Sequence, residues 1–366
     1  MLLTDLQNRD LPKLTVLNDG TVCTKQLWAK RRAELLDLLQ EHIYGYTPAP
    51  PKSVTGEIIQ KSSPRAFAGK AIHEIIKVTF DTPNGSFSFP LQLIIPVCVS
   101  KPAVFLHIAF RPDVPDMYTP AEEIIDNGFA LAIFCYKDVV NDNLRGDYSD
   151  GLGKLYINSR QREKSEWGKI GMWAYAASRA LDYLETRTDV DFKKVSVIGH
   201  SRLGKTALWC AAQDERFFAV ISNDSGKGGA SLLKHSTGET VMSFLKAGSW
   251  DWFCEKWKEY DGHENEIPYD QHFVLSCIAP RPLLVGSAEI DPGADPKSEF
   301  LSCVAASEAY RLLGGKGLIT PDQYPTPGTA LHGGDIAYHI RPGKHYLSRT
   351  DWLYYMEYLK KLILRN

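Results

Sequence analysis

Gly199-His-Ser-Arg-Leu-Gly-Lys-Thr206 joins an apolar run at residues 195–198 to a stretch of small and apolar residues at 203–212. The apolar run predicts a buried strand, and the second stretch has the period of a helix. The turn between them fits two catalytic templates. As G-x-x-x-x-G-K-T it matches a phosphate-binding loop. With a serine two residues after a glycine, it is close to a nucleophile elbow, the sharp turn that holds a reactive serine above a sheet.

Composition narrows the classes of protein to which the chain can belong. Its 366 residues, 44% of them apolar, are enough for one large α/β domain. The net charge of −2, with both signs interspersed, argues against a partner that is nucleic acid or a membrane surface. No apolar run approaches the ~18 residues that cross a bilayer. We therefore expect a small-molecule substrate. We also expect a monomer.

The cysteines and the N-terminus bear on location and cofactors. The seven cysteines are scattered, and none has C-x-x-C spacing. The N-terminal residues lack a basic segment followed by an apolar core. These features predict a cytoplasmic protein with reduced, largely buried thiols and no metal or other cofactor.

The periodicity of apolar residues changes near residue 100. Residues 1–50 read as an N-terminal arm and a helix over 28–44, and three strand-like runs follow over 56–97, the last two joined by a hairpin at Pro83-Asn84-Gly85. Strands and helices then alternate. Strands are predicted at 104–110, 129–136, 195–198, 217–223, 282–286 and 336–340, and helices at 120–127, 166–187, 203–212, 298–313 and 350–364, the last capped by Thr350.

This order predicts a mostly parallel central sheet covered by helices on both faces, an α/β fold of three αβα layers that spans residues 1–366 as one domain. Residues 225–279 interrupt the alternation and are rich in aromatic residues. We interpret that segment as an inserted cap near the active site. The alternative is that its aromatic residues form only the core of the insertion.

The rest of the chain favours the nucleophile elbow. Phosphate-binding loops usually open their domain, whereas several strand-like runs precede this one, although Asp224 could orient Mg²⁺ at the end of a strand. An elbow needs an acid and a histidine after later strands, in that chain order. Glu289 and Asp291 follow the apolar run that ends at residue 288, and His345 follows the last predicted strand. The pattern indicates an α/β-hydrolase fold.

The chain resembles the glucuronoyl methylesterase family, carbohydrate esterase family 15, whose bacterial members are often named acetyl xylan esterases. The resemblance covers roughly residues 100–360. Arg202, beside the serine, is its most specific point. The other matching stretches are Asp214-Glu-Arg-Phe217, Ser222-Asn-Asp-Ser-Gly226, Ile278-Ala-Pro-Arg-Pro282, Ala294-Asp-Pro296, His339-Ile-Arg-Pro-Gly-Lys-His345 and Asp351-Trp352.

The resemblance implies roles for several residues. Ser201 is the expected nucleophile, and His345 the general base and then the general acid. Arg202 is expected to stabilise the oxyanion with its backbone N–H and its guanidinium. Lys205 is expected to face sugar hydroxyls or a uronate.

The acid of the triad is left open by the resemblance, because the family places it after either of two strands. Asp224 fits the first place and Asp291 the second. We favour Asp291, because the loop after that strand is where an α/β-hydrolase orients its histidine, and we keep Asp224 as a partner. Glu289 is the third candidate.

Two positions depart from the family pattern. Gly293, in Asp291-Pro-Gly-Ala-Asp-Pro296, stands where an aromatic residue commonly contacts the uronate, and Lys227 stands where a cysteine or small residue is usual. Trp250 or Trp252 of the insertion is expected to provide a replacement stacking surface.

The expected function is hydrolysis of carbohydrate esters through an acyl-Ser201 intermediate, with 4-O-methyl-glucuronoyl esters as the favoured substrates and no cofactor. A deacetylase of acetylated sugars, an acetyl xylan esterase, is the first alternative. A phosphate-binding-loop nucleotide hydrolase is the second. The third is a binding module without activity, against which the complete set of serine, acid and histidine argues.

Overall fold

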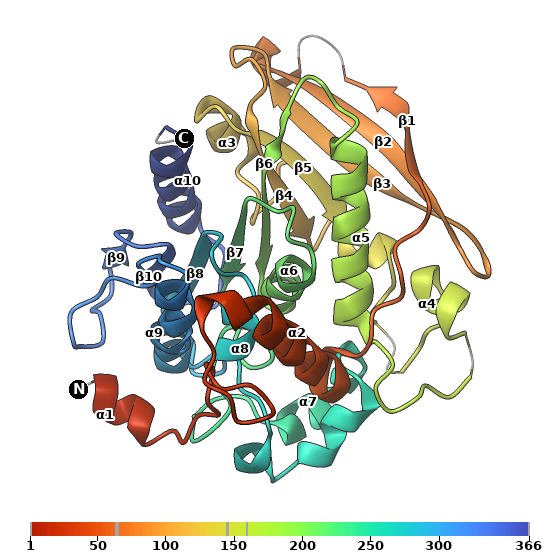
Figure 1. Ribbon diagram of the computed structural model, residues 1–366. Helices are drawn as coiled ribbons and strands as arrows, with labels where there is room; N and C mark the ends of the chain where they lie inside the picture. Colours follow the sequence, from red (N-terminus) through yellow and green to blue (C-terminus); the bar gives the residue numbers. More distant parts are fainter. Residues whose placement is uncertain (1, 63–65, 144–145, 159, 365–366) are drawn as a thin grey trace.

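The computed structural model describes residues 2–62, 66–143, 146–158 and 160–364, and these form one ten-stranded sheet with helices on both faces (Figure 1). The strand order is β1-β2-β3-β5-β4-β6-β7-β8-β10-β9. The strands are β1 Val54–Lys61, β2 Ala71–Thr82, β3 Gly85–Pro96, β4 Ala103–Ala109, β5 Ala130–Cys135, β6 Asp191–His200, β7 Ala219–Asn223, β8 Leu283–Ile290, β9 Ala330–Leu331 and β10 Ile336–Lys344.

The helices of the described residues include all five that were predicted after residue 100. They are α1 Leu2–Gln7, α2 Trp28–Leu39, α3 Ala121–Asp126, α4 Gly151–Tyr156, α5 Lys169–Leu184, α6 Arg202–Gln213, α7 Val241–Ala247, α8 His272–Ser276, α9 Pro296–Leu312 and α10 Arg349–Ile363. A π-helical turn over Gln40–Tyr44 continues α2. The predicted helix over 28–44 is thus an α-helix that ends in a wider turn.

Antiparallel pairing is confined to the two ends of the sheet. Strands β1, β2, β3 and β5 pair antiparallel, and the turn between β2 and β3 is the predicted hairpin, with Thr82 opposite Gly85. From β5 through β4, β6, β7, β8 and β10 the strands are parallel. The parallel strands are apolar and buried over most of their length, as expected where helices cover both faces.

The two faces carry separate hydrophobic cores. One core joins the sheet to α2, α5, α6, α8 and α9, and the other joins it to α3 and α10, which lie on the opposite side of the strands (Figure 1). Trp173 and Trp209 are fully buried in the first core, and Trp352 in the second. The predicted three-layer α/β architecture is confirmed.

Helix α10 corrects one prediction. Its N-cap is Ser348, not Thr350. The Ser348 hydroxyl accepts from the backbone N–H of Asp351, and the Asp351 carboxylate accepts from the backbone N–H of Ser348 at 2.7 Å. This reciprocal capping box needs an acid three residues after the cap, which Ser348 has and Thr350 lacks. Strand β8 also extends to Ile290, beyond the predicted end at residue 286.

The segment 225–279 consists of short helices and 3-10 turns. Phe244, Phe253 and Trp257 contact one another through their rings and are buried, so these aromatic residues form the core of the segment. Six of the seven cysteines are buried and Cys98 is exposed, and all are unpaired, which confirms the expectation of largely buried free thiols. No helix in the described parts of the chain has the length and apolar character needed to cross a membrane.

Candidate active site

Ser201 lies at a strained turn between strand β6 and helix α6. Its φ of 56° and ψ of −127° are unusual for a residue with a side chain, and its N–H donates to the carbonyl of Asn223 at 2.9 Å. A Cβ atom on Gly199 would lie 2.0 Å from the carbonyl oxygen of Leu203. Strand and helix approach so closely at this turn that a glycine is required there.

Lys205 and Thr206 have internal partners, which disfavours the phosphate-binding loop. The Lys205 ammonium donates to the carbonyl of Ser225 at 2.5 Å, and the Thr206 hydroxyl donates to the carbonyl of Arg202 at 2.9 Å. In a phosphate-binding loop the lysine would reach phosphates and the threonine Mg²⁺. Burial lowers the pKa of Lys205, and the carboxylate of Glu239, 3.8 Å away, opposes that shift.

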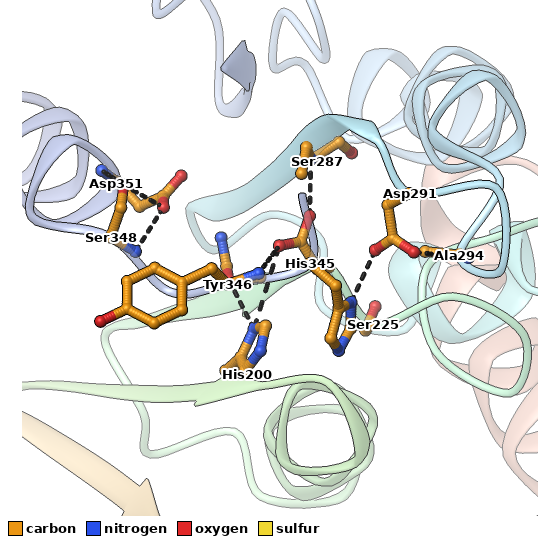
Figure 2. A network of polar contacts seen from close by, with 12 residues as sticks. His200, Ser225, Ser287, Asp291, Ala294, His345, Tyr346, Ser348 and Asp351 are labelled. Atoms are coloured by element: carbon orange, nitrogen blue, oxygen red, sulfur yellow. Dashed lines mark hydrogen bonds and ion pairs between the residues drawn. The ribbon is translucent and has the colours of Figure 1, made fainter. Parts of the chain in front are cut away.

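His345 and Asp291 form a hydrogen-bonded pair. Strands β8 and β10 are parallel neighbours, so the loops after them meet at one edge of the sheet. The Nδ1 of His345 lies 2.6 Å from Oδ2 of Asp291. Burial acts to raise the pKa of Asp291, but the hydrogen bond and charge of His345 outweigh it and hold the pKa below its usual value. Figure 2 shows the His345 ring between Asp291 and His200, whose ring centroid is 4.5 Å from that of His345.

His200 connects this pair to the elbow, because it directly precedes Ser201 in the chain. Its Nδ1 is 2.7 Å from the side-chain oxygen of Asn223. Burial, followed by the charge of His345, lowers the pKa of His200 to about 3. His200 is therefore a neutral packing partner at neutral pH, while the side chain of His345 is 42% exposed and accessible to a substrate.

Asp224 has a different set of partners. One oxygen accepts from the N–H of Ala288 at 2.6 Å, and the other accepts from the Arg341 guanidinium and the N–H of Tyr346, both at 3.2 Å. Burial and the Glu299 carboxylate raise the pKa of Asp224, against the effect of Arg341. Asp224, Asp291 and His345 are nevertheless close together, because their polar atoms lie within 4.8 Å of one another. Glu289, the third candidate, is exposed.

The Arg202 guanidinium is held by an acid and a tryptophan. It donates to Asp142 at 2.5 Å, and its central carbon lies 4.4 Å from the ring centroid of Trp252. Trp252 is only 8% exposed. The ring of Trp250 instead lies under the Lys258 ammonium, at 3.4 Å. The insertion thus contacts the elbow through Trp252, and both predicted tryptophans engage cations of the protein.

Sequence reasoning did not single out four charged residues that the structure places at the site, namely Asp142, Glu239, Glu299 and Arg341. Among them, only Arg341 belongs to a stretch that matches the family, the one over residues 339–345. Its guanidinium binds Asp224 and, through Nε at 2.7 Å, Asp351. The others come from segments without a motif. Only a long-range contact, such as the one between Asp142 and Arg202, identifies them.

Comparisons with known proteins agree with this geometry. The family model described as "Glucuronyl esterase, fungi" matches residues 78–314. A carbohydrate esterase from an unknown prokaryotic organism is 34% identical over 95% of this chain and 88% of its own length. The structure of a glucuronoyl esterase from Solibacter usitatus has a TM-score of 0.87 at 35% identity, covering 96% of this chain and 97% of that one. A promiscuous CE15 esterase from a marine bacterial metagenome has a TM-score of 0.85 at 34% identity, with 96% of both chains covered.

The parallel sheet and the turn at Ser201 define an α/β-hydrolase fold. The matched relatives are esterases, and the protein is an enzyme that hydrolyses carbohydrate esters. The chain belongs to the glucuronoyl esterase family, carbohydrate esterase family 15.

Proposed function

We propose that this enzyme cleaves 4-O-methyl-glucuronoyl esters with Ser201 as nucleophile and His345 and Asp291 as its catalytic partners. The observation that carries the proposal is the 2.6 Å contact between His345 and Asp291 beside the strained serine turn. The esterase relatives support the choice of reaction, and their description as glucuronoyl esterases supports the choice of substrate.

The proposed reaction is a double displacement. The Nδ1–H of His345 donates to Asp291, which leaves Nε2 to accept the Ser201 proton. The serine oxygen adds to the ester carbonyl, and the tetrahedral intermediate expels the alcohol, which takes the proton from His345. Water, deprotonated by His345, then attacks the acyl-serine, and His345 returns that proton to the serine oxygen as the uronic acid leaves and Ser201 is restored. Protons balance over the cycle, and no cofactor is needed.

Arg202 is the proposed oxyanion stabiliser. It is the first residue of the twelve-residue helix α6, so its N–H is one of those that the helix leaves unpaired at its start. Its guanidinium places a fixed positive charge next to the nucleophile, and Asp142 and Trp252 restrict its motion. Charge that is fixed before the reaction stabilises a developing oxyanion without reorganisation.

Lys205 is the proposed contact for the sugar ring, together with Glu239. An ammonium and a carboxylate 3.8 Å apart can donate to and accept from neighbouring sugar hydroxyls. Gly293 offers no side chain for stacking on that ring, and the roles of Trp250 and Trp252 in binding stay predictions.

The test compares initial rates on benzyl glucuronate ester and on an acetylated xylo-oligosaccharide, with Ser201→Ala as control. We expect turnover of the glucuronate ester and its loss in Ser201→Ala. Release of acetate alone would show that the substrate is an acetylated sugar. No turnover of either ester would refute the proposed function.

A further inference from the structure

Glu299 is a fully buried carboxylate behind the active site, in the first turns of helix α9. Its Oε1 accepts from the N–H of Gly226 at 2.9 Å and from the Ser225 hydroxyl at 3.3 Å, and its Oε2 accepts from the Ser287 hydroxyl at 2.5 Å. Its side chain is inaccessible to solvent. A buried carboxylate is costly, and the reaction proposed above makes no direct use of this one.

The partners of Glu299 belong to the two segments that form the site. The Ser225 hydroxyl donates to Glu299, and the Ser225 carbonyl oxygen accepts a hydrogen bond from the Lys205 ammonium. Ser287 lies on strand β8, four residues before Asp291 (Figure 2). Glu299 therefore joins the turn that anchors Lys205 to the strand β8, whose following loop begins with Asp291.

We infer that Glu299 is a positioning residue of the esterase site, which fixes the turn at Ser225 and Gly226 against β8 and provides the buried negative charge that balances the Lys205 ammonium. This inference rests on the proposed function, because Lys205 is there the contact for the sugar ring. Glu239, 3.8 Å from the Lys205 ammonium and 39% exposed, contributes more than Glu299 to the balance of that charge, and Glu299 adds the fully buried carboxylate.

The charge of Glu299 should change near neutral pH. Burial raises its pKa to about 7, against the hydrogen bonds from Ser287 and Gly226. The titratable groups that face it are Lys205, Asp224, Asp291, Cys303, Tyr324 and Tyr338. Lys205 is the cation among them. Above pH 7 the Glu299 carboxylate adds to the balance of the Lys205 charge, and below pH 7 that contribution is lost.

Glu299→Gln keeps the size of the side chain and imitates its neutral form. At pH 8 we expect the KM for benzyl glucuronate ester to rise about tenfold, with kcat changed less than about threefold. At pH 5.5, where the wild-type carboxyl is protonated, the two enzymes should converge. Ionisations that the two enzymes share cancel in the ratio of their rates, so the pH dependence of that ratio reports Glu299. A ratio that does not change with pH would overturn the inference.

Two controls separate positioning from a general effect on the fold. Glu74→Gln removes another buried carboxylate, on strand β2, which pairs with Lys61 and Arg187, and it should lower the Tm without any pH-dependent change in KM. In a Lys205→Met background, adding Glu299→Gln should raise KM no further, because its effect passes through Lys205. A further tenfold rise in KM in the double variant would contradict an action of Glu299 through Lys205.

A spectroscopic measurement tests the inference even if the proposed substrate is wrong. The infrared band of the protonated Glu299 carboxyl, identified by its loss in Glu299→Gln, should titrate near pH 7. In Lys205→Met its midpoint should rise by about one pH unit, because a neighbouring cation stabilises the carboxylate. An unchanged midpoint would refute the charge coupling, whichever ester the enzyme hydrolyses.

Discussion

At the scale of single residues, the partners of the two aspartates predict different roles for them. Asp291 binds His345, whereas Asp224 binds Arg341 and two backbone N–H groups. Asp291→Asn should lower kcat by roughly 10³–10⁴-fold, because an amide cannot hold the histidine in the required tautomer. Its Tm should change little, since Asp291 lies in a loop at the edge of the site.

Asp224→Asn should have the opposite profile. It leaves the buried Arg341 with one acid, Asp351, and breaking a buried ion pair typically costs about 3–5 kcal/mol. We expect a lower Tm and a decrease in kcat of less than about tenfold. The test measures the Tm of both variants by thermal denaturation and their kcat on the same ester, and it shows which aspartate is the triad acid. A larger loss of kcat in Asp224→Asn than in Asp291→Asn would make Asp224 the triad acid.

At the scale of elements, the segment 225–279 is attached to the rest of the protein by a buried ion pair. The Lys169 ammonium, at the start of α5, lies 2.7 Å from Asp251 in the 3-10 turn Trp250–Trp252, and both side chains are almost inaccessible. The next residue, Trp252, stacks on Arg202. The ion pair therefore positions the ring that restricts the guanidinium at the elbow.

Asp251→Asn should weaken both the attachment and catalysis. We expect a fall in Tm and about a tenfold fall in kcat/KM, because a loosened Trp252 no longer orients Arg202. Glu259→Gln, which removes an exposed ion pair between the same segment and Lys164, should leave both unchanged. Lys169→Met combined with Asp251→Leu should recover the stability. A destabilised Asp251→Asn enzyme with normal kcat/KM would contradict the role of Trp252 in orienting Arg202.

The sequence predicted the elements with regular periods and failed where structure depends on distant contacts. The elbow and the alternation of strands and helices after residue 100 follow from local patterns, and the pairing of Asp291 with His345 follows from the α/β-hydrolase pattern. The helices within the segment 225–279 were not predicted, because they are too short to show a period. The partner of Arg202, Asp142, is 60 positions away, and that of Asp224, Arg341, is 117 positions away, so no local pattern reveals either.

At the scale of the whole molecule, buried histidines tie stability to pH. His107, His200 and His272 are nearly inaccessible, and burial lowers their pKa values to about 4, about 3 and about 3. In the unfolded chain each takes up a proton near pH 6.5. Each therefore contributes stability that is fully present above pH 6.5 and is lost as the pH falls below it.

His272 is the best of the three for a test, because it lies in α8, away from the catalytic pair, where its Nε2 is 3.2 Å from the carbonyl of Pro12. His272→Gln can keep that hydrogen bond but cannot titrate. Between pH 6.5 and 4.5 the free energy of unfolding of the wild type should fall relative to the variant by about 1.4 kcal/mol per pH unit. All other groups cancel in this difference, including Glu299, whose raised pKa acts in the opposite direction over the same range. Urea denaturation of both proteins across this range measures the difference, and a difference that does not change with pH would mean that His272 is protonated in the folded protein.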